Sequence, residues 1–220
     1  MTADTRLAAL DPARGALLMI DVQRSFADPA LLGAYGMDAG VSAALAAAID
    51  RCSDLVDHAR AAGVPIYWIE LATEPNTPWR ASRWLRTGDL DAPLDPEEPC
   101  VVGTPGAQWY RIGPRAHETR IRKRAYSGFL GTDLATRLRS DSIRWVTVAG
   151  LTTECCIAAT ATDALQLGWP VVLAEDATAA YEARLHEAAI EQLALNVAAI
   201  SSVDAVASLW RCGTGAEGAA

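Results

Sequence analysis

Lysine is nearly absent from this sequence of 220 residues: 18 of its 19 basic residues are arginine, and Lys123 is the single lysine. An arginine guanidinium stays protonated in proteins, whereas a buried lysine ammonium readily shifts its pKa. The ordinary interpretation of a basic run such as "TRIRKRAYSGF" is a solvated surface. The alternative is that Lys123 fills a position where only a compact cation works, which makes it a candidate functional residue.

Cysteine pairs with C-x-x-C spacing, long apolar runs and a net positive charge are also missing. The five cysteines are odd in number and none has C-x-x-C spacing, which excludes a disulfide framework and a cysteine zinc site and is typical of a reduced protein. No apolar run exceeds the length of a strand, and the first residues lack the regions of a signal peptide. We therefore expect a cytoplasmic protein that does not bind membranes. The net charge of −8 argues against nucleic acid as a partner.

Short apolar runs alternate with longer amphipathic ones, which is the pattern of a parallel sheet with crossover helices. Strands are expected at residues 15–21, 64–71, 120–123, 143–150, 170–176 and 197–201. Helices are expected at residues 39–63, 131–142, 153–167, 181–196 and 203–210. Without repeats or linkers, the chain is expected to form one α/β domain over residues 1–220. We expect three α/β/α layers around a mainly parallel sheet of about six strands, with a core at about 14–210 and a flexible tail at 211–220.

The segment 72–108 differs in composition, being rich in Pro, Glu, Trp and Arg. We expect a long loop with one helical turn around "WRASRWL", and loops of this length in compact domains are usually functional. Trp79, Trp84 and Trp109 are candidates for a pocket wall, with packing of the loop or a subunit interface as the alternative. Arg80 is a candidate to pair with a substrate carboxylate in a bidentate manner.

Candidate reactive residues follow three of the expected strands. A doubly wound sheet binds its ligand at the carboxyl ends of its strands, where Asp21, Lys123 and the segment after Gly150 are expected. The stretch "VAGLTTECCIAA" places two cysteines at a helix start, where the helix dipole favours a thiolate nucleophile and free N–H groups can hold an oxyanion. None of the three histidines lies at such an end, so Asp21 is the candidate base. The alternative for Asp21 is a cap of the following turn.

Three stretches, "LLMIDVQRSF", "RKRAYSGFLGTDL" and "VAGLTTECCIAATATDALQLGWPVVLAEDATAA", resemble the isochorismatase-like family of cysteine hydrolases in their order and separation. The resemblance extends from residue 16 to residue 210. It implies a Rossmann-like fold and a triad of Asp21, Lys123 and Cys156. It also implies a cis peptide between Leu151 and Thr152, and an oxyanion hole formed by the backbone N–H groups of Thr152 and Cys156.

The resemblance also suggests partners and a pocket. A small-molecule substrate is implied, and a homo-oligomer, either a dimer or a tetramer, is usual in such families. The candidates for substrate binding flank the triad or lie in the long loop. They are Gln23, Phe26, Trp79, Arg80, Trp109 and Tyr126.

Three reactions and one non-enzymatic role compete within such a family. The first is hydrolysis of a C–N bond in a small amide, ureido or carbamoyl substrate through an acyl-enzyme on Cys156, with Asp21 as base and acid and Lys123 tuning it. The second is vinyl-ether cleavage as in isochorismatase, a branch that often lacks the cysteine. The third is nicotinamidase chemistry, which needs an Asp and two His as metal ligands. The fourth is an inactive binding module.

Two sequence features favour one of these four candidate functions. No histidine occurs between His58 and His117, so we expect neither a metal nor another cofactor. The stretch "VVGTPGAQW" resembles the one before the lysine motif in ureido and carbamoyl amidohydrolases. Gln108 replaces its usual acidic residue, and Arg124 stands where a proline often follows the lysine. These departures leave the triad unchanged, and we predict an amidase.

Overall fold

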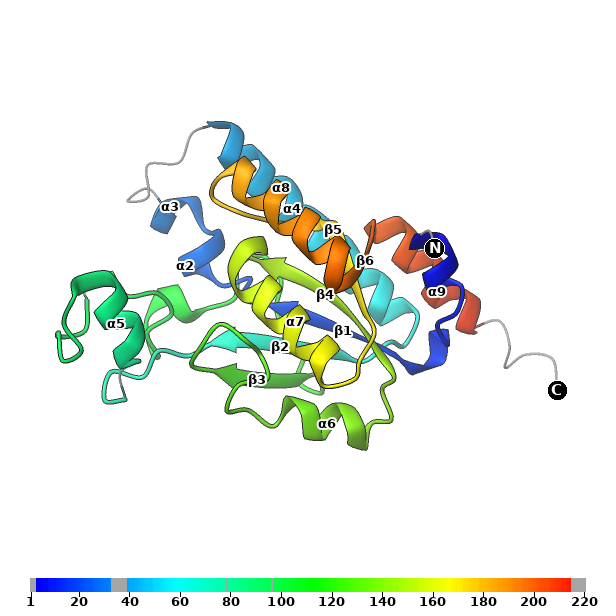
Figure 1. The fold of residues 1–220 in the computed structure, drawn as a ribbon, viewed down its shortest axis with the longest axis horizontal. Coiled ribbons are helices and arrows are strands. Elements are labelled where there is room, and N and C mark those ends of the chain that lie inside the picture. The colour runs from blue at the N-terminus through cyan, green and yellow to red at the C-terminus, as the bar shows by residue number, and fades with distance from the viewer. Residues whose placement is uncertain (1–2, 33–38, 78, 96, 215–220) are drawn as a thin grey trace.

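Six parallel strands form one sheet in the computed structural model, which describes residues 3–32, 39–77, 79–95 and 97–214 (Figure 1). The strands are β1 (Gly15–Ile20), β2 (Ile66–Leu71), β3 (Thr119–Lys123), β4 (Trp145–Leu151), β5 (Val171–Ala179) and β6 (Ala198–Ser201). Their order is β3-β2-β1-β4-β5-β6, and every neighbouring pair is parallel. The order reverses between β1 and β4, the switch point at which doubly wound sheets bind ligands. The predicted six-stranded sheet is confirmed.

Helices cover both faces of this sheet (Figure 1). The α-helices are α1 (Ala3–Leu7), α2 (Arg24–Ala27), α3 (Pro29–Leu32), α4 (Ala39–Ala61), α5 (Arg80–Thr87), α6 (Leu134–Ser140), α7 (Ala158–Gln166), α8 (Ala183–Asn196) and α9 (Val203–Thr214). The shorter turns are η1 (Pro12–Arg14), η3 (Pro105–Ala107) and the π turn η4 (Thr153–Ile157). α4 and α9 pack on one face, and α6, α7 and α8 pack on the other, which gives the predicted three layers.

β1 shows why reactive residues are confined to the strand ends. Its side chains alternate between two cores: Leu17 and Met19 join the core under α4 and α9, and Ala16, Leu18 and Ile20 join the core under α6, α7 and α8. Successive strand residues point to opposite faces, so a central strand covered on both sides must be apolar throughout. A polar side chain can therefore follow β1 but not lie within it.

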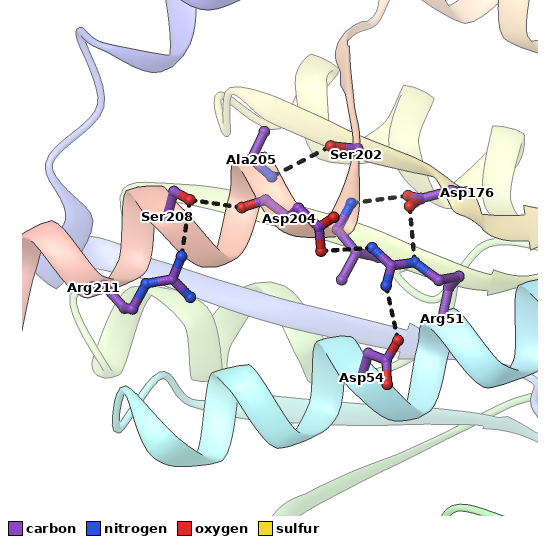
Figure 2. A network of polar contacts seen from close by, with 9 residues as sticks. Arg51, Asp54, Asp176, Ser202, Asp204, Ala205, Ser208 and Arg211 are labelled. Atoms are coloured by element: carbon purple, nitrogen blue, oxygen red, sulfur yellow. Dashed lines mark hydrogen bonds and ion pairs between the residues drawn. The ribbon is translucent and has the colours of Figure 1, made fainter.

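Arg51 on α4 ties three elements together (Figure 2). Its guanidinium donates to Asp176 on β5 at 3.0 Å, to Asp204 on α9 at 2.8 Å and to Asp54 on α4 at 2.8 Å. Asp176 also accepts the backbone N–H of Val203, at the start of α9, at 2.8 Å. These contacts fasten the last helix to α4 and to the sheet.

The chain leaves the sheet after β2 and returns at β3, and we call residues 72–118 the excursion. It carries α5, which lies apart from the sheet at one end of the molecule in Figure 1. α5 ends at Gly88, whose φ of 78° is a left-handed conformation that glycine reaches without strain. The expected helical turn around "WRASRWL" is confirmed.

Many element boundaries differ from the prediction by one to four residues, and two of these differences extend an element toward the C-terminus. α9 continues to Thr214, so the flexible tail expected from residue 211 is wrong for its first part, and residues 215–220 lie outside the described residues. β5 continues to Ala179, beyond the expected end at residue 176, because its pairing with β4 resumes after an irregularity between Val148 and Gly150. Within the described ranges, no helix is both long and apolar enough to cross a bilayer.

Candidate active site

Asp21, Lys123 and Cys156 meet at the carboxyl ends of β1, β3 and β4. The Nζ atom of Lys123 lies 2.7 Å from Oδ2 of Asp21 and donates to Sγ of Cys156 at 3.3 Å. It also donates to the backbone carbonyl of Ala125 at 3.0 Å. Asp21 and Lys123 are fully buried, and Cys156 is 7% exposed. A single ammonium therefore joins the carboxylate to the sulfur.

The order of the strands explains why this cation is a lysine. β2 lies between β3 and β1, so the side chain of Lys123 must cross a strand to reach Asp21. A four-carbon stem with a compact head does this in a space closed to solvent. The three donors of the ammonium match its three contacts, whereas the planar guanidinium of arginine is larger and brings five donors. The single lysine fits where the many arginines would not.

The backbone at Asp21 is unusual. Its φ of 53° lies in the left-handed region, which aspartate tolerates better than most residues but which few non-glycine residues adopt. The Asp21 N–H still donates to the carbonyl of Ile69 on β2 at 2.8 Å, so the residue is held at the last rung of the sheet. Backbone outliers of this kind cluster at functional sites. The conformation turns the chain away from β1 directly at the carboxylate.

Cys156 lies in the π turn that connects β4 to α7. The N–H of Ile157 donates to the carbonyl of Thr152, five residues earlier, at 3.2 Å. Before the turn, Gly150 has a φ of 118°, and a Cβ atom there would lie 2.0 Å from the carbonyl oxygen of Ile20. Only glycine allows β4 to approach β1 this closely. The peptide between Leu151 and Thr152 is cis.

Burial dominates the electrostatics of the three groups. Desolvation raises the pKa of Asp21, although the Lys123 ammonium acts in the opposite direction. The hydrogen bond with Cys155, burial and the charge of Asp21 raise the pKa of Cys156. This direction is opposite to the one that a helix start alone predicts for a thiol, because the contact with Cys155, burial and the nearby Asp21 carboxylate all disfavour a thiolate on Cys156. A thiol beside a carboxylate whose pKa is raised is the arrangement of a nucleophile and its base.

A cavity of about 240 Å³ opens over Cys156. Thr152, Cys155 and Cys156 contribute to its lining, and Asp21 and Lys123 lie buried beneath it. Three predicted substrate-binding residues line it: Phe26, Trp79 and Tyr126. The rings of Trp79 and Tyr126 contact each other edge to face, with centroids 4.8 Å apart. The volume suits a small molecule.

Gln23 and Trp109 do not line the cavity, so their prediction as substrate-binding residues is wrong. The Gln23 amide is buried; it donates to the carbonyls of Leu71 and Ala107 and accepts the N–H of Leu71. Trp109 packs edge to face on Trp68 with centroids 4.9 Å apart. Their sequence positions beside the triad and the loop suggest substrate binding, whereas in the structure both residues hold the excursion against the sheet.

Arg80 and Trp84 also lie outside the cavity lining. The Arg80 guanidinium pairs with Asp91 at 2.8 Å, and both side chains are mostly exposed. Arg83 and Arg86, further along α5, line the cavity instead, as does Arg124 beside the lysine. The cation from α5 was therefore predicted on the correct helix but at the wrong residue, because the sequence does not reveal how α5 is oriented.

The charged residues of the lining fall into paired and unpaired groups. Arg86 pairs with Glu98 at 2.9 Å, and Glu154 accepts the hydroxyl of Thr152 at 3.0 Å. Arg83 donates to the carbonyl of Ala92 at 2.7 Å. Among the described residues, Arg83, Arg124 and the carboxylate of Glu74, which also lines the cavity, form no ion pair. The only sequence signal for Arg124 was its replacement of an expected proline.

Comparisons with known proteins place the chain in a family. A model described as isochorismatase domain matches residues 15–205. The ureidoacrylate amidohydrolase RutB of Methylobacterium radiotolerans is 28% identical over 215 residues, covering 91% of this chain and 81% of that protein. A streptothricin hydrolase of Streptomyces noursei is 34% identical over 184 residues, covering 83% of this chain and 60% of that protein. The chain belongs to the isochorismatase family of hydrolases.

A solved structure supports the same assignment. The isochorismatase family protein of Desulfovibrio vulgaris superposes with a TM-score of 0.72 at 26% identity, covering 90% of this chain and 98% of that one. The predicted Rossmann-like fold and the predicted family are confirmed.

The residues near the cavity do not fit the metal of the nicotinamidase alternative. Within the described ranges, no group of three or more His, Cys, Asp or Glu side chains could hold a metal ion. The stretch after β2 that would supply an Asp and two His contains no histidine.

Proposed function

We propose that this chain is a cysteine-dependent amidohydrolase that cleaves a C–N bond of a small amide, ureido or carbamoyl substrate. The observation that carries the proposal is the contact of the Lys123 ammonium with both the Asp21 carboxylate and the Cys156 sulfur, at 2.7 and 3.3 Å, directly below a cavity. The names of the relatives support the same class, since both the amidohydrolase and the streptothricin hydrolase are hydrolases.

The first half of the reaction forms an acyl-enzyme. Asp21 takes the thiol proton of Cys156 while the sulfur attacks the substrate carbonyl carbon. The carbonyl oxygen becomes an oxyanion, which the backbone N–H groups of Thr152 and Cys156 hold. When the tetrahedral intermediate collapses, the C–N bond breaks and Asp21 returns its proton to the leaving nitrogen.

The second half releases the acid. Water gives a proton to Asp21 and attacks the thioester carbon, and the same oxyanion hole holds the second tetrahedral intermediate. Its collapse breaks the C–S bond, and the sulfur recovers the proton from Asp21. Lys123 stays protonated throughout. Its positive charge lowers the affinity of Asp21 for a proton, so Asp21 can give the proton back.

The cavity supports substrates that combine an apolar part with an anionic group. Phe26, Trp79 and Tyr126 provide the apolar wall. Arg83 and Arg124 take over the role that the sequence suggested for Arg80, because they line the cavity and form no ion pair among the described residues.

A vinyl-ether hydrolase and an inactive binding module remain the alternatives. Vinyl-ether cleavage uses protonation by Asp21 and leaves the Cys156 sulfur without a function. A binding module gives the buried Asp21–Lys123 ion pair no function, and burying such a pair costs free energy.

Ammonia release across a panel of ureido acids, carbamoyl amino acids and small amides tests the proposal. We expect release by the wild type, none by Cys156→Ser, and release close to wild type by the control Cys212→Ser, which changes an exposed cysteine on α9 outside the cavity. Mass spectrometry after rapid mixing should show an acyl adduct on Cys156. A Cys156→Ser variant that keeps wild-type turnover would contradict the proposal, as would a wild type that cleaves only a vinyl ether.

A further inference from the structure

The turn that carries Cys156 is connected to neighbouring elements through the buried hydroxyl of Thr153. Thr153 begins the π turn and is fully buried. Its Oγ1 lies 2.9 Å from Oγ1 of Thr178 and 2.9 Å from Nδ1 of His186. This hydroxyl therefore joins three elements: the turn itself, β5 and α8.

The two partners of the hydroxyl differ in how firmly they are held. Thr178 lies on β5, is 3% exposed, and is paired in register with Gly150, just before the turn. His186 lies in the first helical turn of α8, where its N–H donates to the carbonyl of Glu182 at 3.2 Å. β5 is part of the sheet that carries the site, so Thr178 fixes the turn to its own scaffold. His186 supplies a side-chain hydrogen bond between the turn and α8.

The hydrogen bonds of the three side chains can be completed in either direction. A hydroxyl has one proton and can both donate and accept, and a neutral imidazole donates at one nitrogen and accepts at the other. If Nδ1 accepts, Thr153 donates to His186 and accepts from Thr178; if Nδ1 donates, both roles reverse. In either case the position of Oγ1 of Thr153 is defined by two partners at 2.9 Å.

From this geometry we infer that His186 is a positioning residue for the nucleophile, acting through Thr153 on the turn that holds Cys156. The inference rests on the proposed function, since it assumes that Cys156 is the attacking group. Losing the His186 contact leaves a buried hydroxyl with one partner fewer and removes this hydrogen bond between the turn and α8. A displacement of about 1 Å at a reacting atom can lower a rate by about 10²-fold.

Three substitutions at residue 186 separate positioning from packing. Asparagine places a polar atom about where Nδ1 lies, glutamine places one about where Nε2 lies, and leucine provides bulk alone. We expect His186→Leu and His186→Gln to lower kcat by about 10- to 100-fold with KM changed less than about threefold. His186→Asn should restore kcat to within about threefold of wild type. Equal loss in the asparagine and glutamine variants, or a wild-type kcat in His186→Leu, would overturn the inference.

A second measurement does not depend on the substrate. The rate at which iodoacetamide alkylates Cys156, followed by mass spectrometry of the peptide, reports the placement of the sulfur directly. We expect the same order of variants as for kcat, with Cys212 as an internal reference because it is exposed. If the wild type proves to release no ammonia, this order still tests the inference, so the two failures are distinguishable. Unchanged alkylation in all three variants would overturn it.

Variants of the hydroxyl itself complete the test, and they also serve if His186→Leu fails to fold. Thr153→Ser keeps the hydroxyl, whereas Thr153→Val removes it at similar volume. We expect Thr153→Val to lose kcat as His186→Gln does, and Thr153→Ser to stay close to wild type. Combining Thr153→Val with His186→Gln should add little further loss, because the two residues act through one contact. Fully additive losses would overturn the inference.

Discussion

Asp21 and Glu118 are two carboxylates near opposite ends of the sheet, one fully buried and one in a half-buried residue, and their surroundings differ. Glu118, just before β3, has a side chain only 6% exposed and accepts hydrogen bonds from Arg60, the Trp68 indole and the N–H of Arg115 at 2.7 to 2.9 Å. Asp21, beyond β1, is fully buried and has the Lys123 ion pair, but neither of its oxygens accepts a well-aligned hydrogen bond from the described residues.

The difference shows in the affinity of each carboxylate for a proton. Burial opposes the charge of Glu118, but its hydrogen bonds, above all with Arg60, hold its pKa at about 2. For Asp21, burial outweighs Lys123 and raises the pKa. A carboxylate with every lone pair occupied is a structural anchor, and one left short of donors can accept a proton. The contrast separates the two roles without reference to any relative.

The largest effect is expected at Asp21. Asp21→Asn keeps the shape but removes the base, so turnover should fall by about 10²–10⁴-fold in the ammonia assay. The variant also leaves Lys123 buried without its counter-charge, which costs about 3–5 kcal/mol in urea unfolding. Turnover within tenfold of wild type would show that Asp21 is as structural as Glu118.

A double variant sharpens this result. Lys123→Met alone should lose turnover and stability as Asp21→Asn does. Asp21→Asn combined with Lys123→Met removes both charges at similar volume, so it should recover about 1–4 kcal/mol over the single variants while staying inactive. If the double variant is no more stable than the singles, the two residues are not an isolated pair.

At Glu118 the expected effect is on stability alone. Glu118→Gln removes the charge that Arg60 contacts through two nitrogens, which should lower the free energy of unfolding by about 2–4 kcal/mol. At a temperature where the variant is folded, kcat should stay within about twofold of wild type, since Glu118 and the cavity lie at opposite ends of β3. A loss of kcat without unfolding would contradict the assignment of Glu118 as an anchor.

The stability of the wild type at acid pH should show the contribution of the Glu118 carboxylate. Because its pKa is lower in the folded protein than the ordinary 4.5, its contribution is present above the ordinary value and is lost as the pH falls toward about 2. We expect stability in urea to drop by about 1–3 kcal/mol over this range, with a smaller drop in Glu118→Gln. Equal slopes in the two proteins would show that other carboxylates dominate.

The smallest effect is expected at Arg51, which is 29% exposed in its side chain and shared by three aspartates (Figure 2). Arg51→Met should lower stability by only about 1 kcal/mol, and the loss should shrink in 1 M salt, because partly exposed ion pairs contribute little and are screened. Turnover should be unchanged. If Arg51→Met lowers the free energy of unfolding as much as Glu118→Gln does, the Arg51 ion pairs contribute as strongly as buried ones.

The fold and the meeting of the three reactive residues could be predicted from the sequence because both depend on local patterns. Alternating apolar runs define parallel strands, and the carboxyl ends of parallel strands share one edge. The unique lysine then indicated which basic residue reaches that edge. The single-domain, cytoplasmic, cofactor-free and oligomeric expectations stay predictions.

The cavity walls could not be predicted, because they depend on contacts between distant residues. The orientation of α5 decides that Arg83 rather than Arg80 lines the cavity, and that orientation depends on packing of the excursion. Glu118 gave no signal either, since two of its partners, Arg60 and Trp68, lie at least 50 residues away in the chain. The sequence position of Gln23 suggests ligand binding, but its amide instead binds the backbone of Leu71 and of Ala107 in the excursion.

The excursion has a consequence for how such an enzyme diversifies. Half of the described residues that line the cavity come from the single stretch 72–99, whereas the reactive atoms come from β1, β3 and the turn after β4. The excursion leaves and rejoins the sheet at fixed points. Its length and sequence can therefore change while the proposed reactive atoms keep their positions. Under the proposed function, half of the cavity lining can therefore vary separately from the segments that carry Asp21, Lys123 and Cys156, whereas the other half, including Arg124 and Cys155, lies beside them.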